Sequence, residues 1–296
     1  MVQFWRSSPL WAALTVFGAA LLGTAAGASD TANPGAQRIV AVGGTITEIL
    51  YDLGGEGRIV ARDSTSTFPS RAQDKPDVGY MRALSAEGIL AEKPDLILME
   101  EGSGPPPVID ILKASEIPVV VIPTPPDASM IGTKIRAVGA AVGLSQQAEA
   151  LAATTEQELA KLATEVAAIP AARKKVLFVL SLSNGRVMAG GADTAAGAII
   201  ELAGGINAAP GIRGYKPMSD EAVIAAQPDV ILAMSTSPSH PVTPEKVFAL
   251  PAMQTTPAAA DRALLSMDGL LLLGFGPRTP QAARSLAAQL YPGAIR

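Results

Sequence analysis

The chain has 296 residues, of which 48% are hydrophobic and 17% charged, and its formal net charge is −4 at pH 7. It contains no cysteine and one histidine. This inventory excludes disulfides, thiolate zinc sites, iron–sulfur clusters, cysteine nucleophiles and any metal site that needs two histidines. The mildly acidic balance argues against a nucleic-acid partner.

The first 28 residues have the organisation of a secretory signal peptide. A short start with one positive charge, Arg6, precedes an apolar run at residues 10–22, which is too short to span a bilayer comfortably. Small residues at positions 26–28 then supply a cleavage pattern. We interpret residues 1–28 as a signal that is cleaved before Ser29. The alternative is an uncleaved N-terminal anchor.

Removal of this segment leaves 268 residues with 22 basic and 27 acidic side chains, a formal charge of −5. No later stretch of the sequence approaches a membrane span. Without a cysteine, the chain has no residue to carry the N-terminal lipid of a lipoprotein. We therefore expect an exported protein that is free in the periplasm, is not a lipoprotein and is not embedded in the membrane.

Two parts of the mature chain open with the same pattern of elements. Residues 38–42 (RIVAV) and 175–182 (KVLFVLSL) are typical of buried strands, and each is followed by a helical pattern, at residues 45–53 and 194–202. This order favours an α/β fold. We predict two similar lobes, each with a central, mainly parallel sheet flanked by helices.

An internal repeat supports the duplication of a lobe. The segment LSAEGILAEKPDLIL at residues 84–98 matches MSDEAVIAAQPDVIL at residues 218–232, with a constant offset of 134. Each copy places a serine to cap a short helix, a glutamate in its first turn and a Pro-Asp pair before a buried strand. Shortly upstream of each copy, at residues 79–82 and 214–216, a Gly-Tyr pair precedes a basic residue.

A helical connector is predicted between the lobes. Residues 130–168 contain no proline and carry apolar residues at helical spacing, and Gly143 is the position where a helix would be kinked or interrupted. The expected organisation is a signal peptide at 1–28, an N-terminal lobe at 29–128, one long linker helix at 129–169 and a C-terminal lobe at 170–296. Such a connector implies small rigid-body motions of the lobes.

In this combination the sequence resembles the substrate-binding proteins of helical-backbone ABC importers, also called class III periplasmic binding proteins, which carry haem, ferric siderophores or cobalamin. The segments DVGYMRALSAE at 77–87, GYKPMS at 214–219 and LLLGFGPRT at 271–279 resemble the periplasmic haem-binding subfamily. The likeness extends over residues 38–291. It implies haem (iron protoporphyrin IX) as the transported ligand and an ABC permease dimer with its ATPase subunits as partner. We expect the binding protein to be a monomer.

Tyr80 matches the tyrosine that is the axial ligand of haem iron in that subfamily, so the resemblance implies this role for Tyr80. Tyrosine is an accepted haem ligand. A free tyrosine ionises near pH 10, and ferric iron or a nearby cation favours its phenolate. Arg82, two residues on, is placed to reach that phenolate or a haem propionate. The alternative for Tyr80 is a tyrosine packed at the edge of a domain.

In the second lobe, Tyr215 and Lys216 occupy the corresponding loop and are expected to face Tyr80 across a cleft. Tyr215 would stack on the porphyrin or donate a hydrogen bond, unless it is simply a packed tyrosine. Arg213 and Lys216 are candidate partners of the propionates, because carboxylates favour charge-assisted bonds to arginine and lysine. Their alternative is solvated surface charge.

The sole histidine, His240, lies in a Ser- and Pro-rich loop, STSPSHPVTP, at residues 235–244. It is a candidate for a sixth iron ligand or a propionate contact, and its alternative is an ordinary surface position. Met81 and Met218 lie beside the two Gly-Tyr pairs and are candidate apolar contacts to the macrocycle. Their alternative is packing in the core.

Two glutamates are candidates for contact with the permease. In this class an acidic residue on each lobe docks into arginine pockets of the permease, and Glu87 and Glu221 match those residues by motif position. Favourable electrostatics in the first turn of a helix is a second role for both, and the two roles are compatible.

The sequence favours a binding protein over an enzyme. Gly43 and Gly44 do not form a dinucleotide-binding fingerprint, and neither a G-x-S-x-G element nor a P-loop is present. A ferric siderophore or cobalamin is the alternative ligand to haem. A siderophore site would favour several arginines and aromatic residues, but both tryptophans, Trp5 and Trp11, lie in the predicted signal.

Overall fold

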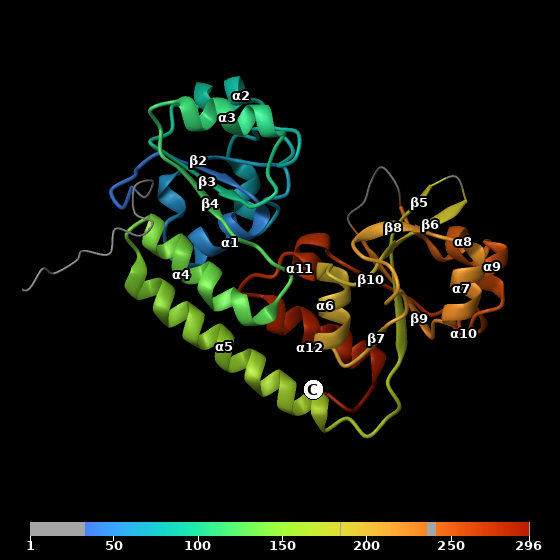
Figure 1. Ribbon diagram of the computed structural model, residues 1–296. Coiled ribbons are helices and arrows are strands. Elements are labelled where there is room, and N and C mark those ends of the chain that lie inside the picture. Colours follow the sequence, from blue (N-terminus) through green and yellow to red (C-terminus); the bar gives the residue numbers. More distant parts are fainter. Residues whose placement is uncertain (1–32, 184, 236–240, 296) are drawn as a thin grey trace, which may run out of the picture. The chain divides into compact units, whose positions relative to one another are not determined.

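The computed structural model describes residues 33–183, 185–235 and 241–295 (Figure 1). The described residues belong to one compact unit. The predicted signal peptide lies outside the described residues. None of the helices in the described part of the chain is both long and apolar enough to cross a membrane.

The N-terminal lobe is a parallel α/β unit. Its elements and the two helices that follow are β1 (Ile39–Val42), α1 (Gly44–Asp52), β2 (Ile59–Arg62), α2 (Ala86–Ala91), β3 (Leu96–Glu100), α3 (Pro106–Ala114), β4 (Val119–Ile122), α4 (Ile131–Ala141) and α5 (Ser145–Ala167). The strands pair in the order β2-β1-β3-β4, and every pair is parallel.

The C-terminal lobe contains a mixed sheet. Its elements are β5 (Lys175–Ser183), β6 (Arg186–Gly190), α6 (Ala195–Leu202), β7 (Ile206–Asn207), β8 (Tyr215–Met218), α7 (Asp220–Ala226), β9 (Val230–Met234), α8 (Pro244–Phe248), α9 (Pro251–Gln254), α10 (Pro257–Ala260), β10 (Leu264–Met267), α11 (Gly269–Leu273) and α12 (Thr279–Leu290). The main strand order is β10-β9-β5-β6-β8, and β7 also pairs with β5. The β6 strand runs antiparallel to β5 and β8, and the other pairs are parallel. The predicted α/β class is confirmed, although this antiparallel part has no counterpart in the first sheet.

Both sheets are buried on their two faces. In β1, Ile39 and Ala41 belong to one hydrophobic cluster, whereas Val40 and Val42 belong to another that includes residues of α2 and α3. The strand β5 alternates in the same way, with Val176 and Phe178 in the first cluster and Leu177 and Val179 in a third. Burial on both faces explains why these strands are continuous apolar runs in the sequence.

The sequence repeat is also a structural repeat. Ser85 and Ser219 each cap a short helix, accepting hydrogen bonds from backbone N–H groups at 3.3 and 3.2 Å. Just after these helices, Lys93 and Gln227 have positive φ angles of 49° and 44°. The aspartates of the two Pro-Asp pairs accept hydrogen bonds from the backbone at the start of the first strand region of their lobe. The two copies therefore share their capping chemistry.

The predicted linker helix consists of two helices. The chain breaks between α4 and α5 at Gly143, whose φ is +72° and whose added Cβ would lie only 2.8 Å from the carbonyl oxygen of Pro34. Arg136 of α4 pairs with Glu149 and Glu156 of α5 at 2.8 and 2.6 Å, so the two helices lie side by side. The expectation of one continuous helix was wrong, and Gly143 is the position of the interruption. The 23-residue helix α5 is the long helix of the connector.

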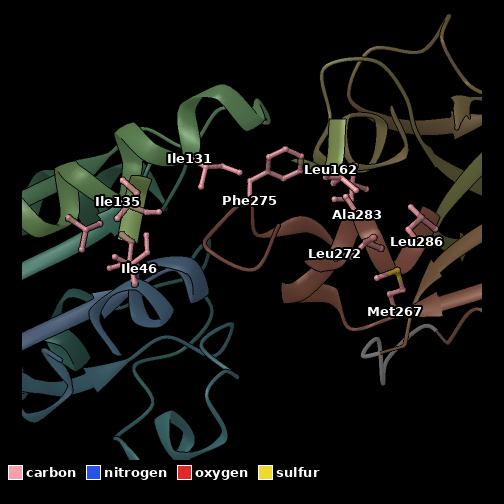
Figure 2. Close-up of a cluster of buried hydrophobic side chains, with 14 of the residues drawn as sticks. Ile46, Ile131, Ile135, Leu162, Met267, Leu272, Phe275, Ala283 and Leu286 are labelled. Carbon is pink, nitrogen blue, oxygen red and sulfur yellow. The ribbon is translucent and has the colours of Figure 1, made fainter. Parts of the chain in front are cut away.

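One hydrophobic cluster contains residues of both lobes. Ile46 of α1 and Ile131 of α4 belong to the same cluster as Leu272, Phe275 and Leu286 of the C-terminal lobe, and Figure 2 shows part of it. Complete burial of a large apolar side chain contributes about 1.5–3 kcal/mol. The two lobes therefore share part of one core.

Polar contacts join the segment after α11 to the N-terminal lobe. Thr45 Oγ1 donates to the carbonyl of Gly274 at 2.8 Å, and Lys134 Nζ donates to the carbonyls of Gly274 and Phe275 at 3.2 and 3.0 Å. Burial lowers the pKa of Lys134, and the charge of Glu100 acts against that shift. The two carbonyls therefore supply polar contacts that partly replace water around a buried ammonium group.

Arg278 connects the lobes more directly. It pairs with Glu48 of α1 at 2.7 Å, and its guanidinium carbon lies 3.5 Å from the centre of the Phe68 ring. The Glu48 side chain is only 4% exposed, so its charge is costly without this partner.

Arg278→Ala is expected to lower the free energy of unfolding by about 3 kcal/mol, because it leaves the buried Glu48 carboxylate without its cation. Arg262→Ala is the matched control. Arg262 also combines an ion pair, with Glu245, and an aromatic contact, with Phe248, but both charged side chains are exposed. Its loss is expected to cost less than about 1 kcal/mol. Urea unfolding measures both, and equal costs would contradict the importance of burial.

The charge of Asp52, at the end of α1, is unfavourable in the folded protein. Burial first, and the Glu48 carboxylate second, raise the pKa of Asp52 to about 6, although Arg278 lowers it. The folded chain therefore holds this proton more tightly than the unfolded chain does. The contribution of Asp52 to stability is complete below the ordinary pKa of 3.8 and is lost as the pH rises through about 6.

Asp52→Asn is accordingly expected to raise the melting temperature near pH 7.5 and to bring no gain near pH 4. Because Asp52 is exposed to solvent, screening limits the gain to at most about 4 °C. Thermal unfolding followed by circular dichroism at both pH values measures it. A gain of the same size at both would show that the charge of Asp52 is not its cause.

Candidate ligand-binding site

Tyr80 lies on the loop between β2 and α2, and 48% of its surface is exposed. The segment before it runs beside the end of β2, where Arg62 and Asp77 form an isolated parallel bridge. The adjacent Gly79 has a φ of +96°, a backbone conformation that favours glycine. The Gly-Tyr pair in the sequence therefore marks a turn that presents a tyrosine to solvent.

The backbone on either side of Tyr80 is held by hydrogen bonds. The N–H of Gly79 donates to Asp77 Oδ1 at 2.8 Å, and its carbonyl accepts from the N–H of Ser64 at 2.9 Å. After Tyr80 the chain turns, and the N–H of Ala83 donates to the Tyr80 carbonyl at 2.7 Å.

The loop after β3 supports the same turn. The N–H of Gly104 donates to the carbonyl of Met81, and the Gly104 carbonyl accepts from the N–H of Leu84, both at 2.9 Å. The proline-rich segment at residues 100–107 therefore contacts the Tyr80 loop directly.

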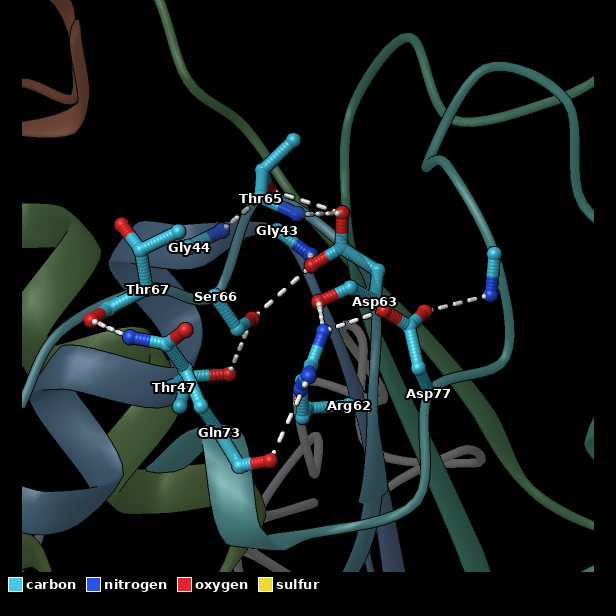
Figure 3. Close-up of polar contacts among 11 residues, drawn as sticks. Gly43, Gly44, Thr47, Arg62, Asp63, Thr65, Ser66, Thr67, Gln73 and Asp77 are labelled. Atoms are coloured by element: carbon cyan, nitrogen blue, oxygen red, sulfur yellow. Dashed lines mark hydrogen bonds and ion pairs between the residues drawn. The ribbon is translucent and has the colours of Figure 1, made fainter. Parts of the chain in front are cut away.

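A buried carboxylate organises the neighbouring loops (Figure 3). Asp63, which has no exposed surface, accepts hydrogen bonds from the N–H of Gly43, from the N–H and hydroxyl of Thr65 and from the hydroxyl of Ser66, at 2.7–3.0 Å. Thr65 in turn accepts from the N–H of Gly44. This network joins the turn between β1 and α1 to the end of β2.

Tyr215 differs from Tyr80 in its surroundings. It opens strand β8, not a loop as expected, and its ring meets Phe178 edge-on with the centroids 6.1 Å apart. Burial raises the pKa of Tyr215, whereas hydrogen bonds with the Ala196 backbone and the Thr194 side chain lower it. The residue thus lies beside the start of α6, and 36% of it is exposed.

Arg82 lies within electrostatic reach of the second tyrosine, because its positive charge also lowers the pKa of Tyr215. Arg82 belongs to the loop of Tyr80 and Tyr215 belongs to the other lobe. The structure therefore brings this basic residue of one lobe into the electrostatic surroundings of the other lobe's tyrosine.

The other candidate cations are exposed. Arg213 pairs with Asp193 at 2.5 Å, and the two side chains are 80% and 62% exposed. A surface pair of this kind contributes little to stability, so Arg213 can exchange its partner for another carboxylate. Lys216, on β8, is exposed.

The two methionines have different environments. Met81 is partly buried and packs against the cluster that includes residues of α2 and α3. Met218 is 5% exposed and belongs to the core of the C-terminal lobe. The structure therefore supports core packing, the alternative given for Met218, over a contact with the macrocycle.

The remaining candidates are located as follows. Glu87 and Glu221 are exposed and lie in the first turns of α2 and α7. Hydrogen bonds from its own backbone N–H and with Ser219 lower the pKa of Glu221. His240 lies outside the described residues.

A cavity of about 600 Å³ lies elsewhere and contains none of the predicted site residues. It is lined by Pro126, Asp127, Ala128, Leu162, Ala163, Val166, Ala167, Arg173, Ala198, Glu201 and Leu202. In the described part of the chain, no three or more His, Cys, Asp or Glu side chains form a group that could hold a metal ion. Among the described residues, the Tyr80 loop is therefore the candidate site.

The sequence reasoning missed the residues that support this loop. Arg62 and Asp63 end a buried strand, and charged residues at the carboxyl end of a parallel strand mark the ligand side of an α/β domain. That signal was present in the segment RDSTST at residues 62–67. The pairing of Arg62 with Asp77 needed the structure, because nothing in the spacing indicates it.

Two solved structures of haem-binding proteins are similar to this chain over most of its length. The periplasmic heme-binding protein RhuT from Roseiflexus sp. RS-1, in its apo form, is 38% identical, with a TM-score of 0.83 and coverage of 88% of this chain and 100% of its own. The periplasmic heme-binding protein BhuT, in complex with two hemes, is 36% identical, with a TM-score of 0.82 and coverage of 87% and 99%.

Two sequence relatives point to the same broad class. The ABC transporter substrate-binding lipoprotein YvrC of Bacillus subtilis (strain 168), itself uncharacterised, is 24% identical over 262 residues, which span 88% of this chain and 82% of YvrC. The vitamin B12-binding protein of Yersinia pestis (strain Pestoides F) is 34% identical over only 84 residues, 28% of this chain and 30% of that protein. The family model described as periplasmic binding protein matches residues 39–269, well over half of the chain. The chain therefore belongs to the periplasmic binding protein family.

Proposed function

We propose that this protein binds haem between its two lobes in the periplasm and delivers it to an ABC importer. The observation that carries the proposal is the exposed Tyr80 on a loop held by backbone hydrogen bonds. It occurs in a chain that is 36–38% identical, over nearly 90% of its length, to two periplasmic heme-binding proteins. The role is capture and transfer of a ligand, not catalysis.

In this proposal the Tyr80 phenolate is the axial ligand of ferric haem iron, which is the cargo of the protein. Arg82 favours the ionised phenol or binds a propionate, and Met81 provides apolar contact. On the other lobe, Tyr215, which is 36% exposed, packs beside the macrocycle. Lys216 and Arg213 bind propionates, and His240 remains a predicted second ligand or propionate contact.

The proposal extends to the partners of the protein and to its location. The permease dimer and its ATPase subunits are the proposed partners, with Glu87 and Glu221 as the docking carboxylates and the binding protein as a monomer. We keep the predicted boundaries, with a cleaved signal at 1–28, lobes at 29–128 and 170–296 and the connector at 129–169. Without a cysteine in the sequence, we propose a free periplasmic protein, in contrast to the lipoprotein YvrC.

Cobalamin is the second candidate ligand, because of the partial match to a vitamin B12-binding protein. A ferric siderophore is a third. The match to the vitamin B12-binding protein covers 28% of this chain, whereas the similarity to the two haem-binding structures extends over 87–88% of it. We therefore rank haem first.

Titration with hemin tests the ligand and the role of Tyr80 together. The wild type is expected to bind hemin with the absorption spectrum of a tyrosinate-ligated ferric haem. Tyr80→Phe and Tyr80→Ala lose the iron ligand, so the charge-transfer band disappears and the affinity falls at least about tenfold.

Tyr51→Phe is the control for this experiment, because Tyr51 is 7% exposed and its hydroxyl makes only a long contact of 3.4 Å to a backbone carbonyl. It is expected to bind hemin like the wild type. Unchanged spectra in both Tyr80 variants would refute the ligand assignment. Binding of cyanocobalamin without binding of hemin would favour the second candidate.

Haem uptake by cells tests the docking residues. The double variant Glu87→Gln, Glu221→Gln keeps the polar groups at both helix starts but removes the charges, so hemin affinity is expected to persist while uptake falls about tenfold or more. Glu116→Gln, at an exposed glutamate outside the repeat, is the control and should support normal uptake. Normal uptake with the double variant would exclude this docking role.

A further inference from the structure

The Tyr80 side chain has little support of its own. Among the contacts found in the described part of the chain, none is a hydrogen bond of the Tyr80 hydroxyl, and 48% of the residue is exposed. The position of the phenol therefore depends on the backbone that carries it, and above all on the preceding Gly79.

Three backbone hydrogen bonds tie the segment before Tyr80 to the end of β2. The N–H of Arg62 donates to the carbonyl of Pro76 at 2.9 Å, the N–H of Val78 donates to the carbonyl of Arg62 at 3.0 Å, and the N–H of Ser64 donates to the carbonyl of Gly79 at 2.9 Å. These bonds fix the path of the chain but leave the N–H of Gly79 to a side chain.

The Asp77 carboxylate satisfies that N–H and is itself oriented by Arg62. Its Oδ1 accepts from the N–H of Gly79 at 2.8 Å, and its Oδ2 accepts from Arg62 Nη1 at 2.5 Å. The same Nη1 also donates to the carbonyl of Asp63 at 3.1 Å, next to the buried network of Figure 3. Arg62, with a side chain 11% exposed, therefore has a fixed position.

We propose that Arg62 and Asp77 are positioning residues that hold Gly79 in its left-handed conformation and so present the Tyr80 phenol to the iron before the ligand arrives. This inference rests on the proposed haem-binding function. Holding the ligand residue in advance removes the entropic cost of ordering it on binding, which increases affinity without adding a contact to the ligand. Neither residue is required to touch the haem.

If Asp77 had a purely structural role, its removal would lower the stability of the protein without a specific change in the bound haem. The Asp77 side chain is 41% exposed, and three backbone bonds remain when its carboxylate is removed. Arg62 also keeps its bond to the Asp63 carbonyl, so the loss of the Asp77 carboxylate should leave the midpoint of urea unfolding almost unchanged. A positioning role, by contrast, changes the behaviour of the bound haem.

The test compares Asp77→Ala and Asp77→Asn in the full chain. Asp77→Ala is expected to raise the hemin dissociation rate about tenfold, to weaken the tyrosinate charge-transfer band and to leave urea unfolding almost unchanged. Asp77→Asn keeps an oxygen that can accept from the N–H of Gly79, so it should recover most of the wild-type rate and band. Asp110→Ala, at an exposed carboxylate of α3, is the control and should resemble the wild type.

A double variant tests whether the two residues act as one unit. If Arg62 acts through Asp77, then Arg62→Ala combined with Asp77→Ala is expected to have the dissociation rate of Asp77→Ala alone. The inference is overturned if the wild type binds hemin through Tyr80 while Asp77→Ala keeps the wild-type rate and band. It falls together with the proposed function if Tyr80→Phe is spectroscopically unchanged, so the two failures are distinguishable.

Discussion

The N-terminal half of the candidate site depends on one buried charge, the carboxylate of Asp63. It has no exposed surface, and its two oxygens accept four hydrogen bonds from the turn after β1 and from the loop after β2. A buried carboxylate is stable only when its oxygens are satisfied in this way. The surrounding loops must therefore keep the conformations that supply these donors, which gives the end of β2 a rigid base.

A chain of hydrogen bonds connects Asp63 to the Tyr80 loop at the surface. Arg62 is bonded to the Asp63 carbonyl and to Asp77, and Asp77 is bonded to the N–H of Gly79. The phenol of Tyr80 follows and is exposed, whereas the ring of Tyr215 packs edge-on against Phe178 of its own lobe. The two lobes repeat the Gly-Tyr sequence but place the two tyrosines in different surroundings.

Buried strands and helix caps could be predicted from the sequence, because their signals lie in neighbouring residues. The repeat could be predicted as well, because its two copies match at a constant offset of 134 residues. Long-range contacts could not. Met218 pairs with the β6 strand and enters the core. The sequence indicated Gly143 as the position of a break, but not its close approach to Pro34. The Arg62–Asp77 pair joins the end of β2 to the segment before Tyr80, and these lie together only because of the path of the intervening loop at residues 63–76. Tyr80 was predictable as a candidate through its motif, but the groups that hold it were not.

The contacts between the lobes limit how the ligand can be released. Wide separation would break the Arg278–Glu48 pair and leave a carboxylate that is 4% exposed without a partner, at a cost of about 3–5 kcal/mol. It would also expose the apolar surface that Phe275 and Ile131 share in one cluster. Small motions avoid both costs. Since the Tyr80 loop is held by hydrogen bonds at an exposed position, a local change there would free the proposed iron ligand at lower cost than opening the shared core.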